Sequence, residues 1–184
     1  PNGSELTYLV PNADIGESWH SPDFDDASWT AARSAIGFGY SPPVSDAIGP
    51  NGDVRSSMGN VNASIYVRMP FELENPIAVV SLTLKTRFED GFVAYLNGRE
   101  IARRNAPNVL EFDSSATASG EVLADDPYEL IPLEFAGDLV AGTNILSFQA
   151  MNNAAGSNDF FLDAELDAEL LDLKLALARR EGAD

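Results

Sequence analysis

The dipeptide Asn97-Gly98 lies between two short apolar runs and constrains the fold of this chain more than any other feature. Phe92–Leu96 precedes the dipeptide, and Arg99–Arg103 follows it. A two-residue type I′ turn needs a positive φ at both central positions, which Asn and Gly adopt best. The sequence therefore predicts an antiparallel β-hairpin at this point.

The segment before this hairpin has the period-2 pattern of a half-buried strand. Every second residue from Leu82 to Phe88 belongs to one set, and the residues between them are polar or charged: Leu82, Leu84, Thr86 and Phe88 alternate with Thr83, Lys85 and Arg87. Successive side chains of a strand point to opposite faces of the sheet, so one set faces the core. We expect a core that contains Leu82, Leu84, Phe88 and Trp29, with Lys85 and Arg87 on the opposite face.

Further β-rich runs are separated by turn residues along the chain. They cover residues 5–10, 65–73, 78–88, 128–135, 145–151 and 160–166, with Leu130 and Ile131 as expected core residues. About eight short strands with turn signals between them predict an all-β antiparallel β-sandwich. We assign residues 1–167 to this module. The long loop at 41–60 is expected to form a binding wall.

Residues 168–184 are expected to form a short C-terminal helix or a linker. Leu, Ala, Glu and Arg favour a helix, and Gly182 follows the segment as a stop signal. The alternation of leucines from Leu171 to Leu177 leaves a strand open as the alternative.

Composition excludes several classes of function. The chain carries 29 acidic and 11 basic residues, a net charge of −18, which argues against binding to nucleic acid or to an anionic membrane. No apolar run reaches the ~18 residues of a membrane span. Cysteine is absent, which excludes disulfides. The single histidine, His20, is expected to be exposed and non-catalytic, so Ser-His-Asp chemistry and multi-histidine zinc sites are unexpected.

Several motifs occur in an order that resembles a known family. They are Pro22–Trp29, Gly37–Tyr40, Val61–Arg68, Phe88–Glu100, Ala141–Leu146 and Ser157–Phe160. Together they resemble the galactose-binding-domain-like jelly-roll module of large secreted bacterial multimodular proteins, beside spore-coat-kinase-like (CotH) and lamin-tail-like domains. The resemblance covers roughly residues 18–166.

The resemblance implies a jelly roll, a bacterial secreted or cell-surface location, and neighbouring domains in a larger chain. It also implies a non-catalytic accessory module of the carbohydrate-binding type. A structural spacer or protein-interaction module without a glycan ligand is the alternative, since this fold hosts many functions.

Polar residues in predicted loops are the candidate ligand-binding groups. They are Tyr40, Glu89, Asp90, Asn152, Asn153 and Asp159. We expect their loops to meet at one end of the sandwich, where carboxylates and amides hydrogen-bond to sugar hydroxyls. Carboxylates repel sulfate and uronate groups, so a neutral sugar is favoured. A basic strip at Arg99, Arg103 and Arg104 leaves an anionic glycan as the second choice.

The acidic turn Asp23–Asp26 has two possible roles. Asp25 or Asp26 can cap free backbone N–H groups, which the spacing favours because the distal Glu of a complete calcium loop is missing. The other role is a structural Ca²⁺ site, as many galactose-binding-like domains have. Its expected ligands are Asp23, Asp25, Asp26 and Asp163, because calcium binds oxygen ligands.

Overall fold

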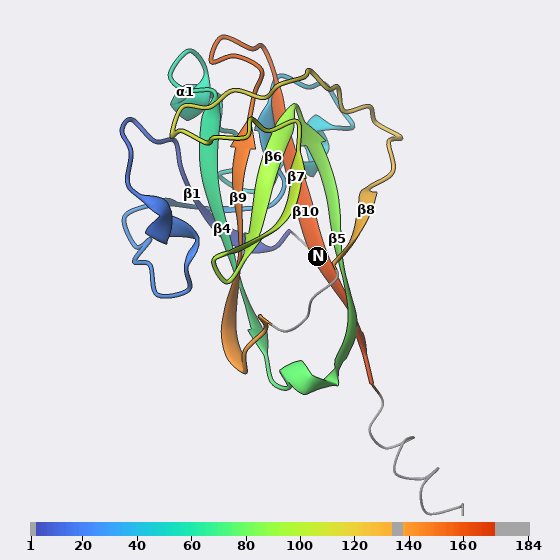
Figure 1. The fold of residues 1–184 in the computed structure, drawn as a ribbon. Coiled ribbons are helices and arrows are strands. Elements are labelled where there is room, and N and C mark those ends of the chain that lie inside the picture. Colours follow the sequence, from blue (N-terminus) through green and yellow to red (C-terminus); the bar gives the residue numbers. More distant parts are fainter. Residues whose placement is uncertain (1–2, 134–137, 172–184) are drawn as a thin grey trace, which may run out of the picture.

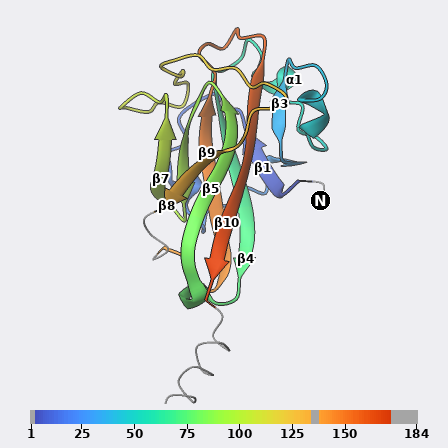
Figure 2. The ribbon, with the colours of Figure 1, turned by 90° about the vertical axis from the view of Figure 1, so that its right-hand side faces the viewer.

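The computed structural model describes residues 3–133 and 138–171, which form two antiparallel β-sheets packed face to face (Figures 1 and 2). The larger sheet has six strands in the order β2-β1-β4-β9-β6-β7. The smaller has four, in the order β3-β10-β5-β8. Within the described residues the one α-helix is the four-residue α1 (Arg55–Met58). The predicted all-β antiparallel sandwich is confirmed.

The elements follow the turn signals of the sequence. The strands are β1 (Glu5–Leu9), β2 (Thr30–Arg33), β3 (Ile36–Phe38), β4 (Ser64–Leu73), β5 (Val79–Glu89), β6 (Gly91–Leu96), β7 (Arg99–Arg104), β8 (Glu129–Leu133), β9 (Gly142–Met151) and β10 (Phe160–Leu170). Short 3₁₀ turns lie at η1 (Glu17–His20), η2 (Ser45–Ala47) and η3 (Pro76–Ala78). None of the helices in the described part of the chain is long and apolar enough to cross a membrane.

The predicted hairpin joins β6 to β7. Asn97 has φ 49° and Gly98 has φ 93°, the two positive values that this turn requires. The Asn97 carboxamide also accepts the backbone N–H of Ile145 at 2.8 Å and donates to the Asp138 carbonyl at 2.7 Å. The turn residue therefore fixes the hairpin against the start of β9 as well as reversing the chain.

The core between the sheets follows the predicted register of β5. Leu82 and Leu84 are buried, and Trp29 is buried in a second cluster, whereas Phe88 is half-buried against the core. Lys85 points away from the core and pairs with Asp167 on β10 at 2.8 Å. The predicted inward and outward faces of this strand are confirmed.

The outer face of the six-stranded sheet carries a second apolar cluster. On β4, Ile65 and Val67 face the core between the sheets, while Tyr66 and Arg68 face outward. Two loops cover this outer face: the β1–β2 loop, which contains η1, and the β7–β8 loop. The cluster consists of Trp19, Trp29, Tyr66, Val93, Tyr95 and Met151. We refer to it as the outer cluster.

The side chain of Arg68 holds the β1–β2 loop on the sheet. Arg68 is only 2% exposed, and its guanidinium donates to the carboxylate of Asp26 at 2.8 Å. It also donates to the backbone carbonyls of Trp19, Ser21 and Phe24. One buried cation thus gathers four acceptors from a loop that has little regular structure of its own.

Two sequence expectations differ from the structure. Leu130 is 61% exposed, whereas its neighbour Ile131 packs against the core, because Ile131 pairs with the inward-facing Leu84 and Leu130 is displaced by one residue. The predicted core role of Leu130 is therefore wrong.

The last strand is also longer than expected. β10 continues to Leu170, so the segment from Ala168 begins as strand, because pairing with β5 continues to Val79 and overrides helix propensity. The rest of the predicted C-terminal helix, residues 172–184, lies outside the described residues.

Replacement of Arg68 tests how the loop is held. We expect Arg68→Met to lower the free energy of unfolding by about 2–4 kcal/mol, because Asp26 and three loop carbonyls lose their donor. Urea denaturation measures the loss. The matched control, Arg33→Met, breaks an exposed pair with Glu5 and should cost less than about 1 kcal/mol. Equal losses for the two variants would contradict this role.

Candidate functional site

The six residues predicted to bind a ligand lie together at the end of the sandwich where β5 turns into β6. Tyr40 donates its hydroxyl hydrogen to the carboxylate of Glu89. The Asn153 backbone N–H donates to Asp90 Oδ2 at 2.7 Å, and Asn152 Nδ2 donates to the Asp159 carbonyl at 2.9 Å. Four separate loop positions thus meet in one polar network.

This network is mostly buried, and most of its polar groups have partners within the protein; Asn152 Oδ1 is buried without a partner among the described residues. Glu89, Asp90 and Asn152 are at most 3% exposed. The remaining oxygen of the Asp90 carboxylate accepts the Gly120 N–H at 2.5 Å, and its backbone carbonyl accepts Asn105 Nδ2 at 2.7 Å. Ligand binding by these residues stays a prediction. Their observed contacts close the end of the sandwich, so Asp90→Ala is expected to destabilise the fold.

Glu89 has an unusual protonation equilibrium within this network. Burial raises the pKa of Glu89 to about 8, opposed by the Tyr40 hydrogen bond and reinforced by the neighbouring carboxylates of Asp159 and Asp90. Burial and the same hydrogen bond also raise the pKa of Tyr40 above its ordinary value. At pH 7 the Glu89 carboxyl group therefore stays largely protonated.

Stability should depend on pH through this group. Because the folded state retains a proton that the unfolded chain releases, the free energy of unfolding should fall from about pH 4.5 to about pH 8. Glu89→Gln lacks this loss, so its stability should rise relative to the parent across that window. Denaturant titrations at several pH values measure the difference. The exposed residue Glu74 lies outside this network, so Glu74→Gln is the control for loss of a carboxylate. If the free energy of unfolding of Glu89→Gln, relative to the parent, were as constant with pH as that of the control, Glu89 would not retain its proton in the folded state.

Three of the four aspartates expected to bind calcium have other contacts. Asp26 accepts from Arg68 and from the Thr7 hydroxyl at 2.8 Å. Asp25 accepts the Ala27 N–H at 3.0 Å, which is the predicted local capping contact. Asp163 lies on β10 in the other sheet and accepts from Tyr128 at 2.5 Å.

No three acidic, histidine or cysteine side chains are grouped to hold a metal ion anywhere in residues 3–133 and 138–171. Calcium binding by Asp23, Asp25, Asp26 and Asp163 stays a prediction.

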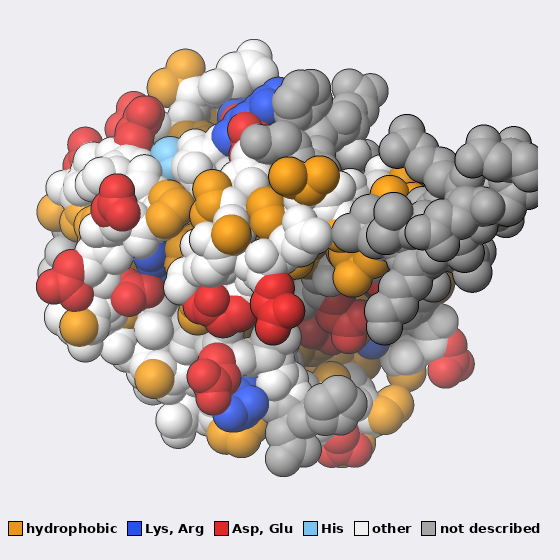
Figure 3. Space-filling view, turned by 90° about the horizontal axis from the view of Figure 1, so that it is seen from below, with side chains coloured by type: hydrophobic (Ala, Val, Ile, Leu, Met, Phe, Trp, Pro, Cys, Tyr) orange, Lys and Arg blue, Asp and Glu red, His pale blue; other side chains and the backbone are white. Residues whose placement is uncertain are grey.

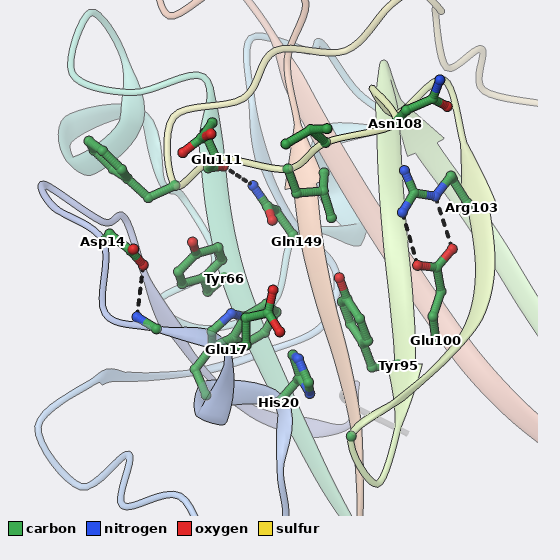
Figure 4. Close-up of a pocket in the computed structure, with 16 residues that line it drawn as sticks. Asp14, Glu17, His20, Tyr66, Tyr95, Glu100, Arg103, Asn108, Glu111 and Gln149 are labelled. Atoms are coloured by element: carbon green, nitrogen blue, oxygen red, sulfur yellow. Dashed lines mark hydrogen bonds and ion pairs between the residues drawn. The ribbon is translucent and has the colours of Figure 1, made fainter.

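A cleft of about 560 Å³ opens elsewhere, on the outer face of the six-stranded sheet (Figure 4). Its floor is formed by Tyr66 on β4, Tyr95 on β6 and Gln149 on β9. Tyr66 is paired directly with Gln149 across the β4–β9 ladder, which places both side chains on the same face. The two walls are the segments 14–20 and 108–112.

The two floor tyrosines present their hydroxyl groups and hide their ring faces. Trp19 stacks on Tyr66 at 4.2 Å between ring centroids, and His20 stacks on Tyr95 at 4.3 Å. Both hydroxyls point into the cleft (Figure 4), and neither has a hydrogen-bond partner among the described residues. Burial foremost, together with nearby carboxylates, raises the pKa of each tyrosine to about 12, so both remain protonated.

Gln149 ties the floor to one wall. Its Nε2 donates to the Glu111 carbonyl at 2.8 Å and to Ser64 Oγ at 3.0 Å. The carboxamide oxygen faces the cleft (Figure 4). Together with the tyrosines it adds an acceptor beside two hydroxyl groups that can both donate and accept.

The walls carry more acidic than basic groups. Asp14, Glu17 and Glu111 line the cleft and form no ion pair within the described residues. Arg103 also lines it, but both its Nε and a terminal nitrogen donate to the two carboxylate oxygens of Glu100 at 2.9 Å. The charge of this arginine is therefore compensated locally.

His20 differs from the sequence expectation. It is half-buried against Tyr95 instead of exposed, and burial lowers its pKa, so it is neutral at pH 7. The cleft as a whole was not predicted from the sequence. The available signal was the alternation in β4, which places Tyr66 and Arg68 on the face opposite Ile65 and Val67, as a covered outer face requires.

The basic strip predicted on β7 is neutralised by ion pairs. Arg99 pairs with Asp138 at 3.1 Å, Arg103 with Glu100, and Arg104 with Glu129 at 2.6 Å. These contacts leave little net positive charge for an anionic glycan. The long loop at 41–60, predicted as a binding wall, does not line the cleft.

Neither a protein-family model nor a curated protein sequence matches this chain. Among solved structures, the fold is similar to part of several bacterial glycosidases. The match to a Bacteroides uniformis β-glucuronidase has 13% identity and a TM-score of 0.50, covering 89% of this chain and 17% of that one. A calcium-binding mutant of Bacteroides uniformis β-glucuronidase 2 matches with 12% identity and a TM-score of 0.50, with 88% and 17% covered.

A β-glucuronidase from an uncultured Clostridium species matches with 15% identity and a TM-score of 0.47, over 81% of this chain and 21% of its own. The chain thus spans about a fifth of the length of these enzymes. At such identities the likeness concerns the fold alone.

Proposed function

We propose that this chain is a non-catalytic, carbohydrate-binding accessory module of a larger secreted or cell-surface bacterial protein. The observation that carries the proposal is the cleft on the six-stranded sheet, with two unpartnered tyrosine hydroxyls and the Gln149 oxygen on its floor. Sugars are recognised by a small number of polar groups held at fixed positions in a concave surface. Here strand pairing holds those groups rigidly.

The size of the fold relatives supports a module. The two with a TM-score of 0.50 are bacterial β-glucuronidases of which this chain spans 17%. A piece of this size within a glycosidase agrees with an accessory role in a multimodular chain. The domain neighbours that the sequence resemblance implies, spore-coat-kinase-like and lamin-tail-like, stay predictions.

Two carboxyl groups that could serve as a catalytic acid are not placed for that role, which supports a non-catalytic module. A glycosidase places an acid with a raised pKa and a second carboxylate on either side of the scissile bond. Glu89, whose pKa burial raises, is enclosed beneath Tyr40 and does not line the cleft. Glu100 in the cleft is engaged by Arg103 on both oxygens.

One observation favours a second candidate, a protein-interaction or spacer module. Hydrophobic side chains gather at the end of the sandwich that contains η3, away from the β5–β6 turn (Figure 3). There Ile77 is 91% exposed, and Val80 and Leu170 are more than half exposed. A small apolar groove of about 200 Å³ lies beside them, lined in part by Phe71 and Leu166. Exposed apolar surface of this kind is typical of a contact with another domain.

Removal of the floor hydroxyls tests the carbohydrate-binding proposal. A glycan array identifies a ligand for the parent, and calorimetry then measures affinity. Tyr66→Phe and Tyr95→Phe should each weaken binding about threefold to tenfold, the effect of one lost hydrogen bond. The stacked rings remain, so thermal stability should change little.

The control is Tyr128→Phe, which removes a hydroxyl bonded to Asp163 outside the cleft and should leave affinity unchanged. An array without any ligand, or unaltered affinity in both cleft variants, would favour the spacer candidate.

A further inference from the structure

The cleft has a strongly acidic wall next to its tyrosine floor. Asp14 and Glu17 lie on the same wall, and Glu111 lies on the other. Their electrostatic influence reaches the floor. After burial, Asp14 helps to raise the pKa of Tyr66; at Tyr95, burial and Glu100 raise the pKa, Arg103 opposes them, and Glu17 adds a smaller upward contribution. A ligand group that rests on the tyrosines is therefore within range of these carboxylates.

Nothing in the described cleft compensates these three charges. Arg103 is paired on both oxygens of Glu100 and also donates to the Pro107 carbonyl. His20 is neutral at pH 7 and stacked on Tyr95. Acidic residues alone are common on a protein of net charge −18 and would not mark a site.

The two tyrosine side chains supply the second, independent observation. Tyr66 is 4% exposed and Tyr95 is 9% exposed, yet both hydroxyls point into the cleft without a partner in the described structure. The side chains are held in place by burial, while their hydroxyl oxygens stay open at the bottom of the cleft. Two fixed, open hydroxyl groups in an acidic cleft indicate a ligand with several hydroxyl groups and a positive charge.

Resting on the proposed function, we propose that the cleft selects sugars with a free amino group, such as glucosamine oligomers, over neutral or acidic sugars. The ammonium group lies against Asp14 and Glu17, where its three N–H donors meet carboxylate oxygens. Sugar hydroxyls bond to Tyr66, Tyr95 and the Gln149 oxygen. The stacked partners cover the ring faces, so the carboxylates, and not a cage of aromatic faces, recognise the charge.

Other ligand classes fit the cleft less well. Uronic acids and sulfated sugars meet three uncompensated carboxylates. An N-acetylated sugar lacks the charge that these carboxylates attract. A lysine-rich peptide carries the charge, but it has no equivalent of the closely spaced hydroxyls that the two tyrosines and Gln149 match.

Calorimetry on the full chain with four probes of equal length tests this inference. The probes are a glucosamine oligomer, its N-acetylated counterpart, a cello-oligosaccharide and an oligolysine. The glucosamine oligomer should bind at least about tenfold more tightly than the two uncharged sugars at low salt, and this advantage should shrink as added salt screens the charges.

A pair of charge-removing variants provides the comparison. Asp14→Asn combined with Glu17→Gln should abolish the tenfold preference, and Asn at position 14 can retain the Oδ1 contact with the Gly16 N–H. The control Glu74→Gln with Glu121→Gln removes the same charge from exposed sites outside the cleft and should retain the preference.

The outcomes separate this inference from the proposed function. Equal binding of the glucosamine oligomer and an uncharged sugar would overturn the amino-sugar preference and leave carbohydrate binding intact. If oligolysine binds as tightly as the glucosamine oligomer, the preferred ligand is a basic peptide and the amino-sugar inference is overturned. If none of the three sugars binds and the glycan array shows no ligand, the proposed function itself is overturned.

Discussion

The interaction on which the outer face of the six-stranded sheet depends is the burial of the Arg68 guanidinium beneath the β1–β2 loop. A buried cation is costly unless its donors are engaged, and four of the five N–H groups of Arg68 donate to Asp26 and to three backbone carbonyls. The same contacts give the loop a defined course across the sheet. Trp19 and His20 lie in that loop, so Arg68 also holds the two rings that stack on the tyrosines of the cleft floor.

The loop held by Arg68 also helps to cover the outer face of the six-stranded sheet. That sheet is therefore buried on both faces, with one opening on the outer face. The outer cluster packs under the β1–β2 and β7–β8 loops, which reach the same face from opposite edges of the sheet. Between them the hydroxyl ends of Tyr66 and Tyr95 stay accessible, although their rings are covered. The cleft is therefore a gap between two coverings, and its polarity comes from the tips of otherwise buried side chains.

The polar network at the β5–β6 corner also consists of carboxyl and amide groups, but here they bond to the protein itself instead of lining an open cleft. Glu89, Asp90 and Asn152 converge as expected, but their partners are backbone amides and other side chains of the same end. A buried carboxyl group is stabilised here by retaining its proton, which raises the pKa of Glu89 to about 8. Convergence of polar loops thus closes one end of the sandwich, and the open site lies on a sheet face.

The local patterns of the sequence were sufficient to determine the sandwich, the Asn97-Gly98 hairpin and the inward face of β5, because turn chemistry and period-2 burial depend only on near neighbours. The meeting of Tyr40, Glu89 and Asp90 also followed from loop order. The cleft was decided by tertiary structure alone. The openness of the two tyrosine hydroxyls, the ion pairing of the β7 arginines and the end of β10 depend on contacts between segments far apart in the chain, and no local pattern specifies those contacts.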